Sequence, residues 1–328
     1  MAGIDFTGLP DKMKAYSLRE GESLLSTILI DDQEFLNYMD LLVDVVDEQA
    51  LTQMYIDSVL QPGGKDEFNA KGTAQFKNRI GKVRDCKIDF TLTPKQINAM
   101  WKSYLGRINK SKRGDVYDAP LQQYILEKIS SKGKEELRLA AMFKGVFNDA
   151  KTASNRVFDG ILPLLSDAGI IDAKQIFAGA PVTQANAIDQ LEGVADKVPS
   201  QYVNTDIVAL VEPDVAKFYN RDYRATYGTK QDYSGFEHKL LDGTRIEIVP
   251  EPGLAGTGAI LMTPRNNFVW MTGELNSQDA FIIEKRRRNI DIMADFQAAP
   301  DLAIAELVWV NDIALNAGKA LRTAAAAE

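Results

Sequence analysis

Three glycines fall within six residues of the chain, in the run GLAGTG at residues 253–258. A glycine run after a strand-like segment can bind phosphate, because glycine lets backbone amides approach an anion closely. The known phosphate loops, however, lead into a helix, and the Walker type continues with Lys and then Ser or Thr. Here AILM and Pro264 follow, which favours a strand. The run is therefore predicted to be a flexible turn between two strands and not a nucleotide site.

Histidine and cysteine, the side chains most used in metal sites and nucleophilic chemistry, occur once each. His238 lies in SGFEHKLLDG, without a second histidine or a glutamate at the spacing of zinc sites. Cys86 lies in KVRDCKID, where no histidine is close in sequence to activate it, so an inert thiol is expected. The sequence predicts no catalytic residue, no metal site and no cofactor, and the protein is not expected to be an enzyme.

The length of 328 residues is enough for one sizeable core or for two unequal domains. No apolar run approaches the roughly 20 residues needed to span a bilayer, so no membrane contact is expected. The N-terminal residues lack a basic segment followed by an apolar one, and no secretory signal is predicted. A single cysteine excludes an intrachain disulfide and is typical of a protein assembled in the cytoplasm.

Charge is distributed unevenly along the chain. Residues 1–60 carry 12 acidic and 3 basic side chains, a net charge of −9, whereas residues 61–118 carry 13 basic and 6 acidic, a net charge of +7. Opposite blocks can attract each other within one subunit or between copies. The formal net charge of the whole chain is −8, which argues against general affinity for DNA. We therefore expect the protein to surround nucleic acid, if it meets any, and not to grip it.

The first sixty residues are predicted to contain an arm and two helices. Residues 1–20 are polar and contain Gly and Pro, which indicates an extended arm. Residues 31–60 place Phe35, Met39 and Leu42 at helical spacing, which predicts an acidic amphipathic helix followed by a second short one before Leu60. Residues 65–92 differ, because glycines interrupt short alternating segments, and they predict a charged two-stranded excursion. A two-stranded ribbon is marginally stable alone, so a neighbouring chain is expected to support both the ribbon and the arm.

The middle of the chain carries the strongest helical signal. A Thr-Pro start predicts a short helix over residues 93–108. Residues 117–145 are predicted to form a long helix, opened by Asp118 and Pro120. Gly133 falls on its apolar stripe, which suggests either close approach of another backbone or a slight bend. Beyond residue 150, short helices and strands alternate, and the segments RIEIV, AILMTP, IDIMADFQAA and LAIAELVWVND are predicted as strands.

Three segments together resemble the tailed-phage major capsid proteins of the HK97-like fold: DIVALVEPDVAKFYNRDYRATYG, GTRIEIVPEPGLAGTGAILMTPRNNFVWMTG and IDIMADFQAAPDLAIAELVWVND. In that family a strand and a Pro-containing turn precede a helix with RDYR-like residues. A strand, a glycine-rich turn and a TP-x-x-N-F-V-W pattern follow. A charged hairpin ahead of a Pro-started long helix matches the family further upstream. The likeness covers most of residues 48–312.

The resemblance implies an α+β fold with an N-terminal arm, an extended β-hairpin loop, a peripheral domain and an axial domain. The arm would comprise residues 1–48, the extended loop 61–92 and the axial domain 152–273. The peripheral domain would comprise residues 49–60, 93–151 and 274–328, with a long spine helix over 117–145. Because only about fifty residues precede the hairpin, a separate scaffold protein or none is expected.

The function implied by the resemblance is structural. Copies of the chain would self-assemble into pentamers and hexamers of an icosahedral shell that encloses double-stranded DNA without sequence-specific binding. Further partners would be a scaffold, a portal and decoration proteins. The shell would be the capsid of a virion, assembled in the host cytoplasm.

Two charged segments supply the residues that we expect at contacts between subunits: Lys65, Phe68, Lys71, Phe76, Lys77, Arg79, Arg286 and Arg287. The last two belong to the run EKRRRN, for which a solvated turn is the alternative. Reversing the charges at Lys71, Lys77 and Arg79 is expected to impair assembly and to leave the secondary structure of the subunit intact. Phe268 and Trp270 are expected in the core.

Three other functions stay open at this point. An encapsulin-like compartment would share the fold and enclose a protein cargo instead of DNA. Another phage structural protein, such as a tail-tube or connector subunit, is a second alternative, which the long hairpin and the Pro-started helix disfavour. An enzyme acting through GLAGTG or His238 is the third.

Overall fold

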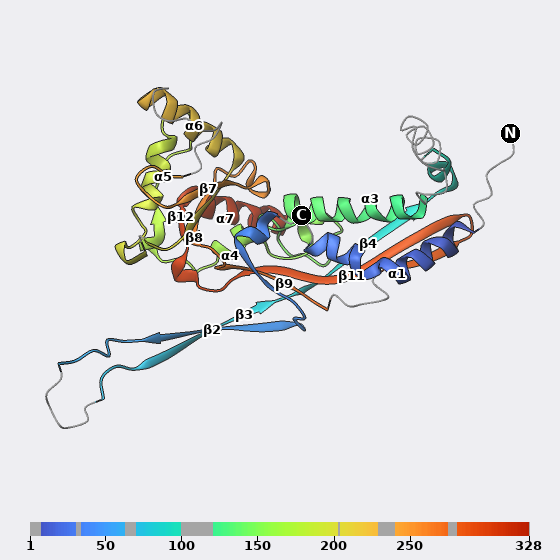
Figure 1. Ribbon diagram of the computed structural model, residues 1–328, viewed down its shortest axis with the longest axis horizontal. Helices are drawn as coiled ribbons and strands as arrows, with labels where there is room; N and C mark the ends of the chain where they lie inside the picture. Colours follow the sequence, from blue (N-terminus) through green and yellow to red (C-terminus); the bar gives the residue numbers. More distant parts are fainter. Residues whose placement is uncertain are drawn as a thin grey trace.

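The computed structural model describes residues 8–30, 34–62, 70–99, 121–202, 204–228, 240–274 and 281–327. Figure 1 shows an elongated molecule in which a long sheet with two covering helices adjoins a second, smaller sheet with helices of its own. A two-stranded ribbon projects beyond both sheets. The fold therefore has two layered parts and one projection.

The first sheet is built around one long strand. In the order β1, β9, β11, β10 its strands are Met39–Leu42, Phe268–Thr272, Asn289–Leu302 and Phe281–Arg286, and β4 (Arg84–Leu92) also pairs with β11. β1 is parallel to β9, and the other pairs are antiparallel. Alternation along β11 buries Ile290, Ile292 and Ala294 on one face, as expected for a sheet covered on one side.

Two helices pack beside this sheet. α1 (Leu9–Leu29) contacts both α3 (Leu121–Glu136) and β10. Met13, Leu25 and Ile28 of α1 are almost fully buried, and the Ser17 hydroxyl donates to the Phe281 carbonyl at 2.7 Å. The expected extended arm over residues 1–20 is therefore wrong for residues 9–20. They form the first half of a helix because their few apolar side chains share one helical face and bury there.

The two predicted helices within residues 31–60 are also wrong. Residues 34–37 form a single 3₁₀ turn, Glu34–Asn37, and the chain then enters β1 and β2 (Glu48–Ile56). Met39 and Leu42, which have helical spacing, pair instead with Phe268 and Met271 of β9. Pairing with a buried strand outweighs the local pattern, because propensity is a weak prior beside tertiary packing.

The long helix begins at Leu121 in the described residues and continues beyond Glu136 as one π-helical turn, Leu137–Ala141. The predicted stretch 117–120 lies outside the described residues. A Cβ placed on Gly133 would lie 3.1 Å from the Ile88 Cδ1 of β4. The expected close approach at this glycine is thus present, but it is made by side chains and not by a backbone. Of the predicted helix over 93–108, residues 94–99 are helical and the rest lies outside the described residues.

The second sheet has the order β5, β12, β8, β6, β7, with bounds Ile176–Phe177, Trp309–Asn311, Ile260–Pro264, Ile207–Val211 and Glu247–Pro250. All five residues of β6 are buried, as a continuous apolar run in a central strand predicts. The helices α5 (Ala187–Ala195), α6 (Pro213–Tyr227) and α7 (Asp312–Ala327) contact this sheet, and the short helix α4 (Ile161–Leu165) packs against α7 and against β11 of the first sheet. The predicted strand that runs through Pro213 into a helix is confirmed by β6 and α6.

Short 3₁₀ turns connect these elements at Ser154–Arg156, Ala173–Gln175, Ser200–Tyr202, Pro252–Leu254 and Ala305–Leu307. The last of them interrupts the segment LAIAELVWVND, so only its end forms the strand β12. β12 pairs with β5 and β8, which places this late segment in the second sheet.

Trp270 of β9 is buried and contacts residues from several segments of the chain. Its indole N–H donates to the Leu29 carbonyl at the end of α1 at 3.1 Å. The rings of Phe35 and Phe158 meet it edge-on, with centroids 5.6 and 5.8 Å away. Phe268 and Trp270 are fully buried, which confirms their predicted place in the core.

The projecting ribbon consists of β2 and β3 (Ala74–Lys82), paired from Glu48↔Lys82 to Ile56↔Ala74. A two-stranded excursion was predicted over residues 65–92, and a ribbon is present, but its first strand lies upstream of that range. β4, which was assigned to the excursion, belongs to the first sheet. Cys86 and Leu92 of β4 are buried there, and burial of these side chains draws the strand into the body.

Candidate interaction surfaces

The glycine run does bind an anion, but the anion belongs to the same chain. Glu212 stands between β6 and α6, and its two carboxylate oxygens accept from the amides of Gly256 and Gly258, each at 2.6 Å. Both glycines have a positive φ, 79° and 62°, which side chains disfavour. The run joins β7 to β8, and these strands flank β6 on opposite sides. The prediction of a turn between two strands is confirmed, and Glu212 occupies the amides that a phosphate would need.

A second carboxylate, Glu251, ties the two parts of the molecule together. It is fully buried, and Arg138 of the π-helical turn donates to it through Nε at 3.0 Å. The Gly253 amide donates to the same oxygen at 3.1 Å, and the Tyr38 hydroxyl donates to the other. The charge is thus paired and hydrogen-bonded, as a buried ion must be. Glu251 thereby connects three segments: the end of the long helix, the residue just before β1 and the segment after β7.

The ribbon has an apolar face that is largely exposed in the part of the chain that the structure describes. Cross-strand pairing places these residues on one face: Ala50 with Ile80, Met54 with Phe76, and Ile56 with Ala74. Met54 is 52% exposed, Ile80 61% and Phe76 65%. Large apolar side chains gathered on a projecting ribbon mark an interaction surface, because an isolated two-stranded ribbon has no core in which to bury them.

The opposite face of the ribbon is held by the body. The Arg79 guanidinium lies 2.6 Å from the Asp301 carboxylate of β11. Burial raises the pKa of Asp301, and the charge of Arg79 opposes that rise. Farther along the ribbon, burial and then a hydrogen bond with Glu306 raise the pKa of Tyr55 to about 12. A Cβ on Gly81 would lie 2.9 Å from Met271 Sδ, so the chain passes close to β9 there.

The expected contact residues of the ribbon have different surroundings. Phe76 is exposed, whereas Arg79 is engaged by its own chain. Lys71 is exposed, and its ammonium group donates to the Leu60 carbonyl at 2.6 Å. Lys77 lies in β3, but its side chain is not described. Lys65 and Phe68 lie outside the described residues.

Some of the charge in the acidic and basic blocks is paired inside one subunit. The Lys82 ammonium group of β3 lies 3.2 Å from the Glu48 carboxylate and 3.6 Å from that of Asp47. The sequence left open whether the two blocks attract each other within one subunit or between copies. At the base of the ribbon, the attraction occurs within the subunit. Exposed pairs of this kind contribute little stability, about 0–1 kcal/mol each.

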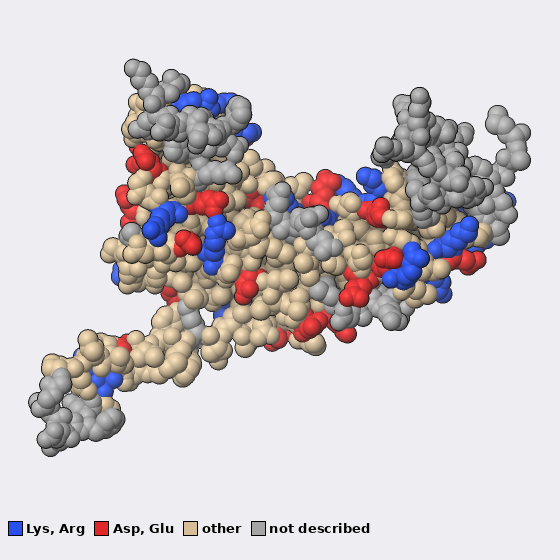
Figure 2. All heavy atoms as spheres, in the orientation of Figure 1, with Lys and Arg blue, Asp and Glu red and all other residues tan. Residues whose placement is uncertain are grey.

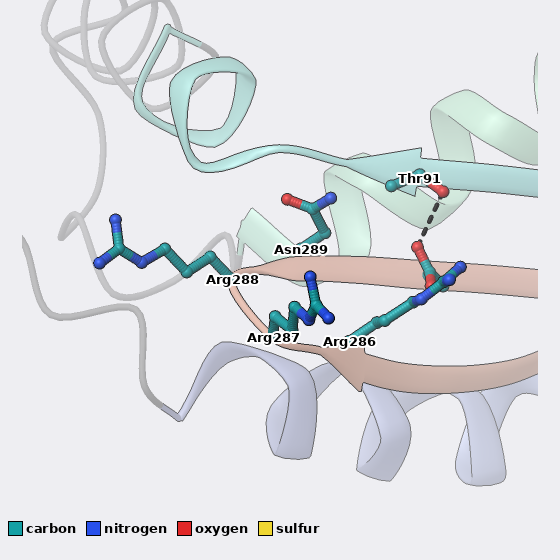
Figure 3. A pocket seen from close by; sticks show the side chains of 6 residues that line it. Thr91, Arg286, Arg287, Arg288 and Asn289 are labelled. Atoms are coloured by element: carbon teal, nitrogen blue, oxygen red, sulfur yellow. Dashed lines mark hydrogen bonds between the residues drawn. The ribbon is translucent and has the colours of Figure 1, made fainter.

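The arginines of EKRRRN form the turn between β10 and β11. Arg286 pairs with Asn289, and Arg287 has a φ of 57°, which closes a two-residue hairpin turn. An open depression of about 560 Å³ beside the turn is lined by Thr91, Arg286, Arg287, Arg288, Asn289 and Asp291. Figure 3 shows Arg288 pointing away from the hairpin, while the Arg286 side chain lies along the sheet. The Thr91 hydroxyl donates to the Asp291 carboxylate at 2.8 Å.

These arginines are exposed, so the structure brings the two predicted residues, Arg286 and Arg287, together on one surface. Guanidinium groups bind carboxylates and phosphates in a bidentate manner, so the turn suits an anionic partner. The turn and the ribbon lie at opposite ends of the elongated molecule, as Figure 1 shows. The two expected contact regions are therefore separate surfaces.

Of the two side chains considered for catalysis, Cys86 and His238, the structure describes one. Cys86 is buried, and burial raises the pKa of its thiol to about 12, as expected for an inert thiol. His238 lies outside the described residues. In the part of the chain that the structure describes, no cluster of three or more His, Cys, Asp and Glu side chains could hold a metal ion. No described helix is both long and apolar enough to cross a membrane.

Comparison with known proteins gives a match of fold and not of sequence. No protein-family model matches the chain, and no curated protein does. Among solved structures, the satellite phage P4 procapsid with its size determination (Sid) protein aligns with a TM-score of 0.60 and 12% identity, over 90% of each chain. The capsid of a native GTA particle aligns with a TM-score of 0.51 and 8% identity, over 87% of this chain and 97% of the other.

A third similar structure is an encapsulin. The holo-SrpI encapsulin complex from Synechococcus elongatus PCC 7942 aligns with a TM-score of 0.50 and 10% identity, over 87% of this chain and 88% of that one. All three are shell proteins, and the alignments extend over nearly the whole chain. The protein has the HK97-like capsid fold, a mixed α+β architecture, and the resemblance read from the sequence is confirmed at the level of fold.

Proposed function

We propose that copies of this chain assemble into pentamers and hexamers of an icosahedral shell, the capsid of a tailed phage, which encloses double-stranded DNA. The single observation that carries the proposal is the ribbon with an exposed apolar face, built on a capsid fold. Met54, Phe76 and Ile80 are each more than half exposed among the described residues, and a neighbouring subunit would cover them. Burial between chains then favours assembly by mass action.

In this proposal the elements take the following roles. The ribbon of β2 and β3 is the extended loop, α3 is the spine helix of a peripheral domain built on the first sheet, and the second sheet belongs to the axial domain. Residues 9–29 form α1 and are packed on the body, so they are not part of an extended N-terminal arm. The Arg286–Arg288 turn is a contact with an acidic surface of a neighbouring subunit.

Enclosure of DNA is supported by the charge of the chain, not by a binding site. The formal net charge is −8, and a wall of that sign repels a polyanion at short range. The shell would be part of a virion and would be assembled in the host cytoplasm, with a separate scaffold protein or none. The subunit has a structural role and no enzymatic one.

An encapsulin-like compartment is the second candidate, favoured by the fold likeness to the SrpI encapsulin. Expression of the chain followed by negative-stain microscopy tests whether shells form. The contents separate the candidates: nuclease-protected DNA supports the capsid, and a co-purified enzyme supports the compartment. A monomer that forms no particle with or without added phage proteins would contradict both.

A paired substitution tests the apolar face itself. Phe76→Asp puts a charge on this face, whereas Gln75→Asp puts one on the opposite face of the same strand. We expect Phe76→Asp to abolish particles and leave a folded subunit, because a charge buried between chains without a partner is costly. Gln75→Asp should assemble. Normal particles from Phe76→Asp would exclude this face as the covered one.

A further inference from the structure

Two helices at one end of the molecule carry exposed stripes of opposite charge. On α5, Asp189, Glu192 and Asp196 are exposed at spacings of three and four residues, counting the carboxyl-terminal cap. These spacings place the three carboxylates on one face of a helix. The face turned inward carries Leu191 and Val194, which are fully buried. The acidic stripe is therefore the solvent side of α5.

The basic stripe lies on α6. Lys217, Arg221 and Arg224 are exposed at spacings of four and three residues. Tyr219 and Tyr223 occupy the buried side of the same helix. The first and last charges of each stripe are seven positions apart, about 10 Å along a helix axis. The two stripes thus match in length and number of charges and are opposite in sign.

In the part of the chain that the structure describes, no recorded ion pair joins the two stripes. Burial raises the pKa of Glu192, and the charges that raise it further are those of Asp189, Asp196 and Asp242. Two of the basic side chains have partners on their own helix: Lys217 pairs with Asp214 at 2.8 Å, and the Arg224 Nε donates to the Asn220 carbonyl at 3.2 Å. In Figure 2 acidic atoms lie at the left edge and basic atoms at the top of this end of the molecule, and Figure 1 places α5 and α6 there.

We propose that the acidic face of α5 in one copy packs against the basic face of α6 in the next copy. The proposal rests on the shell function proposed above and names one of its contacts. Because the two faces are different surfaces of one subunit, the contact is head-to-tail. Repetition of a head-to-tail contact closes a ring when the rotation permits, which is what a pentamer or hexamer requires.

Charge pairs at such a contact set the register and the rate of association more than the affinity. Each exposed pair contributes little, but the contact recurs at every interface of a ring. The contact also weakens with salt, because the Debye length falls from about 10 Å at 0.1 M to about 3 Å at 1 M. Ring formation by this chain should therefore depend on ionic strength.

A charge exchange tests the contact. Glu192→Lys and Arg221→Glu are made singly and together, and assembly of each purified chain is followed by light scattering and microscopy. Each single reversal should raise the subunit concentration needed for assembly about five- to tenfold, since like charges then face each other at each interface. The double variant should return to within about twofold of wild type, because the pair is restored with its signs exchanged.

Two matched controls make the same charge changes elsewhere on exposed helix positions: Glu22→Lys on α1 and Lys319→Glu on α7. Unlike the two single reversals, both controls should assemble at about the same subunit concentration as wild type. Single reversals that behave like wild type, or a double variant as impaired as the singles, would overturn the contact. Loss of DNA retention by Arg221→Glu with unchanged assembly would assign the basic stripe to nucleic acid instead. If the wild-type chain forms no particles, the shell function itself fails.

Discussion

The guanidinium of Arg79 and the carboxylate of Asp301 lie 2.6 Å apart. Arg79 belongs to the ribbon and Asp301 to the end of β11, more than two hundred residues later in the chain. The Asp301 side chain is only 7% exposed, whereas that of Arg79 is 22% exposed. This pair joins the projecting ribbon to the body, so the direction of the ribbon is set within the single subunit.

Removing Arg79 should therefore destabilise the subunit itself. Arg79→Met leaves Asp301 as an uncompensated buried charge, and we expect a loss of about 2 kcal/mol in the free energy of unfolding, measured with urea. Arg79→Met combined with Asp301→Asn should lose less than the single variant, because no buried charge remains. Equal losses of unfolding free energy in the two variants would show that the Arg79–Asp301 ion pair does not stabilise the fold. The charge reversals expected from the sequence to act only on assembly should, at Arg79, also act on the fold.

Glu212 should stabilise the glycine turn. Glu212→Gln replaces one acceptor oxygen by a donor, so one of the two glycine amides loses its partner. We expect a loss of about 1–2 kcal/mol in the free energy of unfolding and faster amide exchange at Gly256 and Gly258. Asp214→Asn, an exposed change two residues away, is the control and should change neither quantity. Unchanged exchange in Glu212→Gln would mean that the carboxylate does not order the turn.

The sequence predicts those parts of the fold in which local pattern and burial agree. The strand through Pro213 into α6, the long helix and the buried Phe268 and Trp270 all follow from spacing and turn residues. The ribbon is also predicted, because a charged segment that cannot form a core must find support elsewhere. Its boundaries are not, since β2 and β3 pair across an intervening loop and the pattern does not fix where pairing begins.

Other features depend on long-range contacts that no spacing reveals. Phe35, Met39 and Leu42 fit a helix locally, and only β9, more than two hundred residues later, makes strand pairing the better solution. The glycine run correctly predicts a turn, but its partner Glu212 lies in another element. Likewise, the sequence marks Arg79 as a charged residue of the loop, and only the fold brings Asp301 to it. The exposed stripes of α5 and α6 are visible as spacing once the helices are assigned.

Cys86 should be unreactive in the folded protein. Burial raises the pKa of its thiol from 9.0 to about 12, so the thiolate fraction at neutral pH is about a thousandfold lower than in the unfolded chain. We expect a disulfide reagent to modify Cys86 rapidly in urea and at least about a hundredfold more slowly without it. Fast modification of the native protein would contradict the burial of β4 beneath the helices.

The same shift has a consequence for stability at alkaline pH. The folded pKa is above the unfolded pKa, so the stabilising contribution is fully present below pH 9.0 and is lost as the pH rises toward about 12. Cys86→Ala removes this contribution. The difference in unfolding free energy between wild type and Cys86→Ala should therefore be constant from neutral pH to about pH 8 and should shift against wild type above pH 9.0. A constant difference over the whole range would mean that the thiol titrates equally in both states.

The Asn311 side chain should stabilise the place where the glycine turn, β8 and α7 meet. Its amide nitrogen donates to the Gly258 carbonyl at 2.9 Å, and its oxygen accepts from the amides of Ile260 and Ala314 at 3.1 and 3.2 Å. It thus fixes the end of the glycine turn, the start of β8 and the first turn of α7 together. Asn311→Leu leaves three backbone groups without their partner, two of which are buried.

We expect Asn311→Leu to lower the free energy of unfolding by about 3 kcal/mol, because each buried group left unsatisfied costs about 1–3 kcal/mol. Asn316→Leu makes the same change at an exposed position of α7 and should be close to neutral. Urea unfolding of both variants measures the difference. Asn311→Asp provides a second comparison, since it keeps the acceptor for Ile260 and Ala314 but loses the donor to Gly258, and its loss should be intermediate. A smaller loss in Asn311→Leu than in Asn311→Asp would show that the hydrogen bonds of this side chain do not hold the junction together.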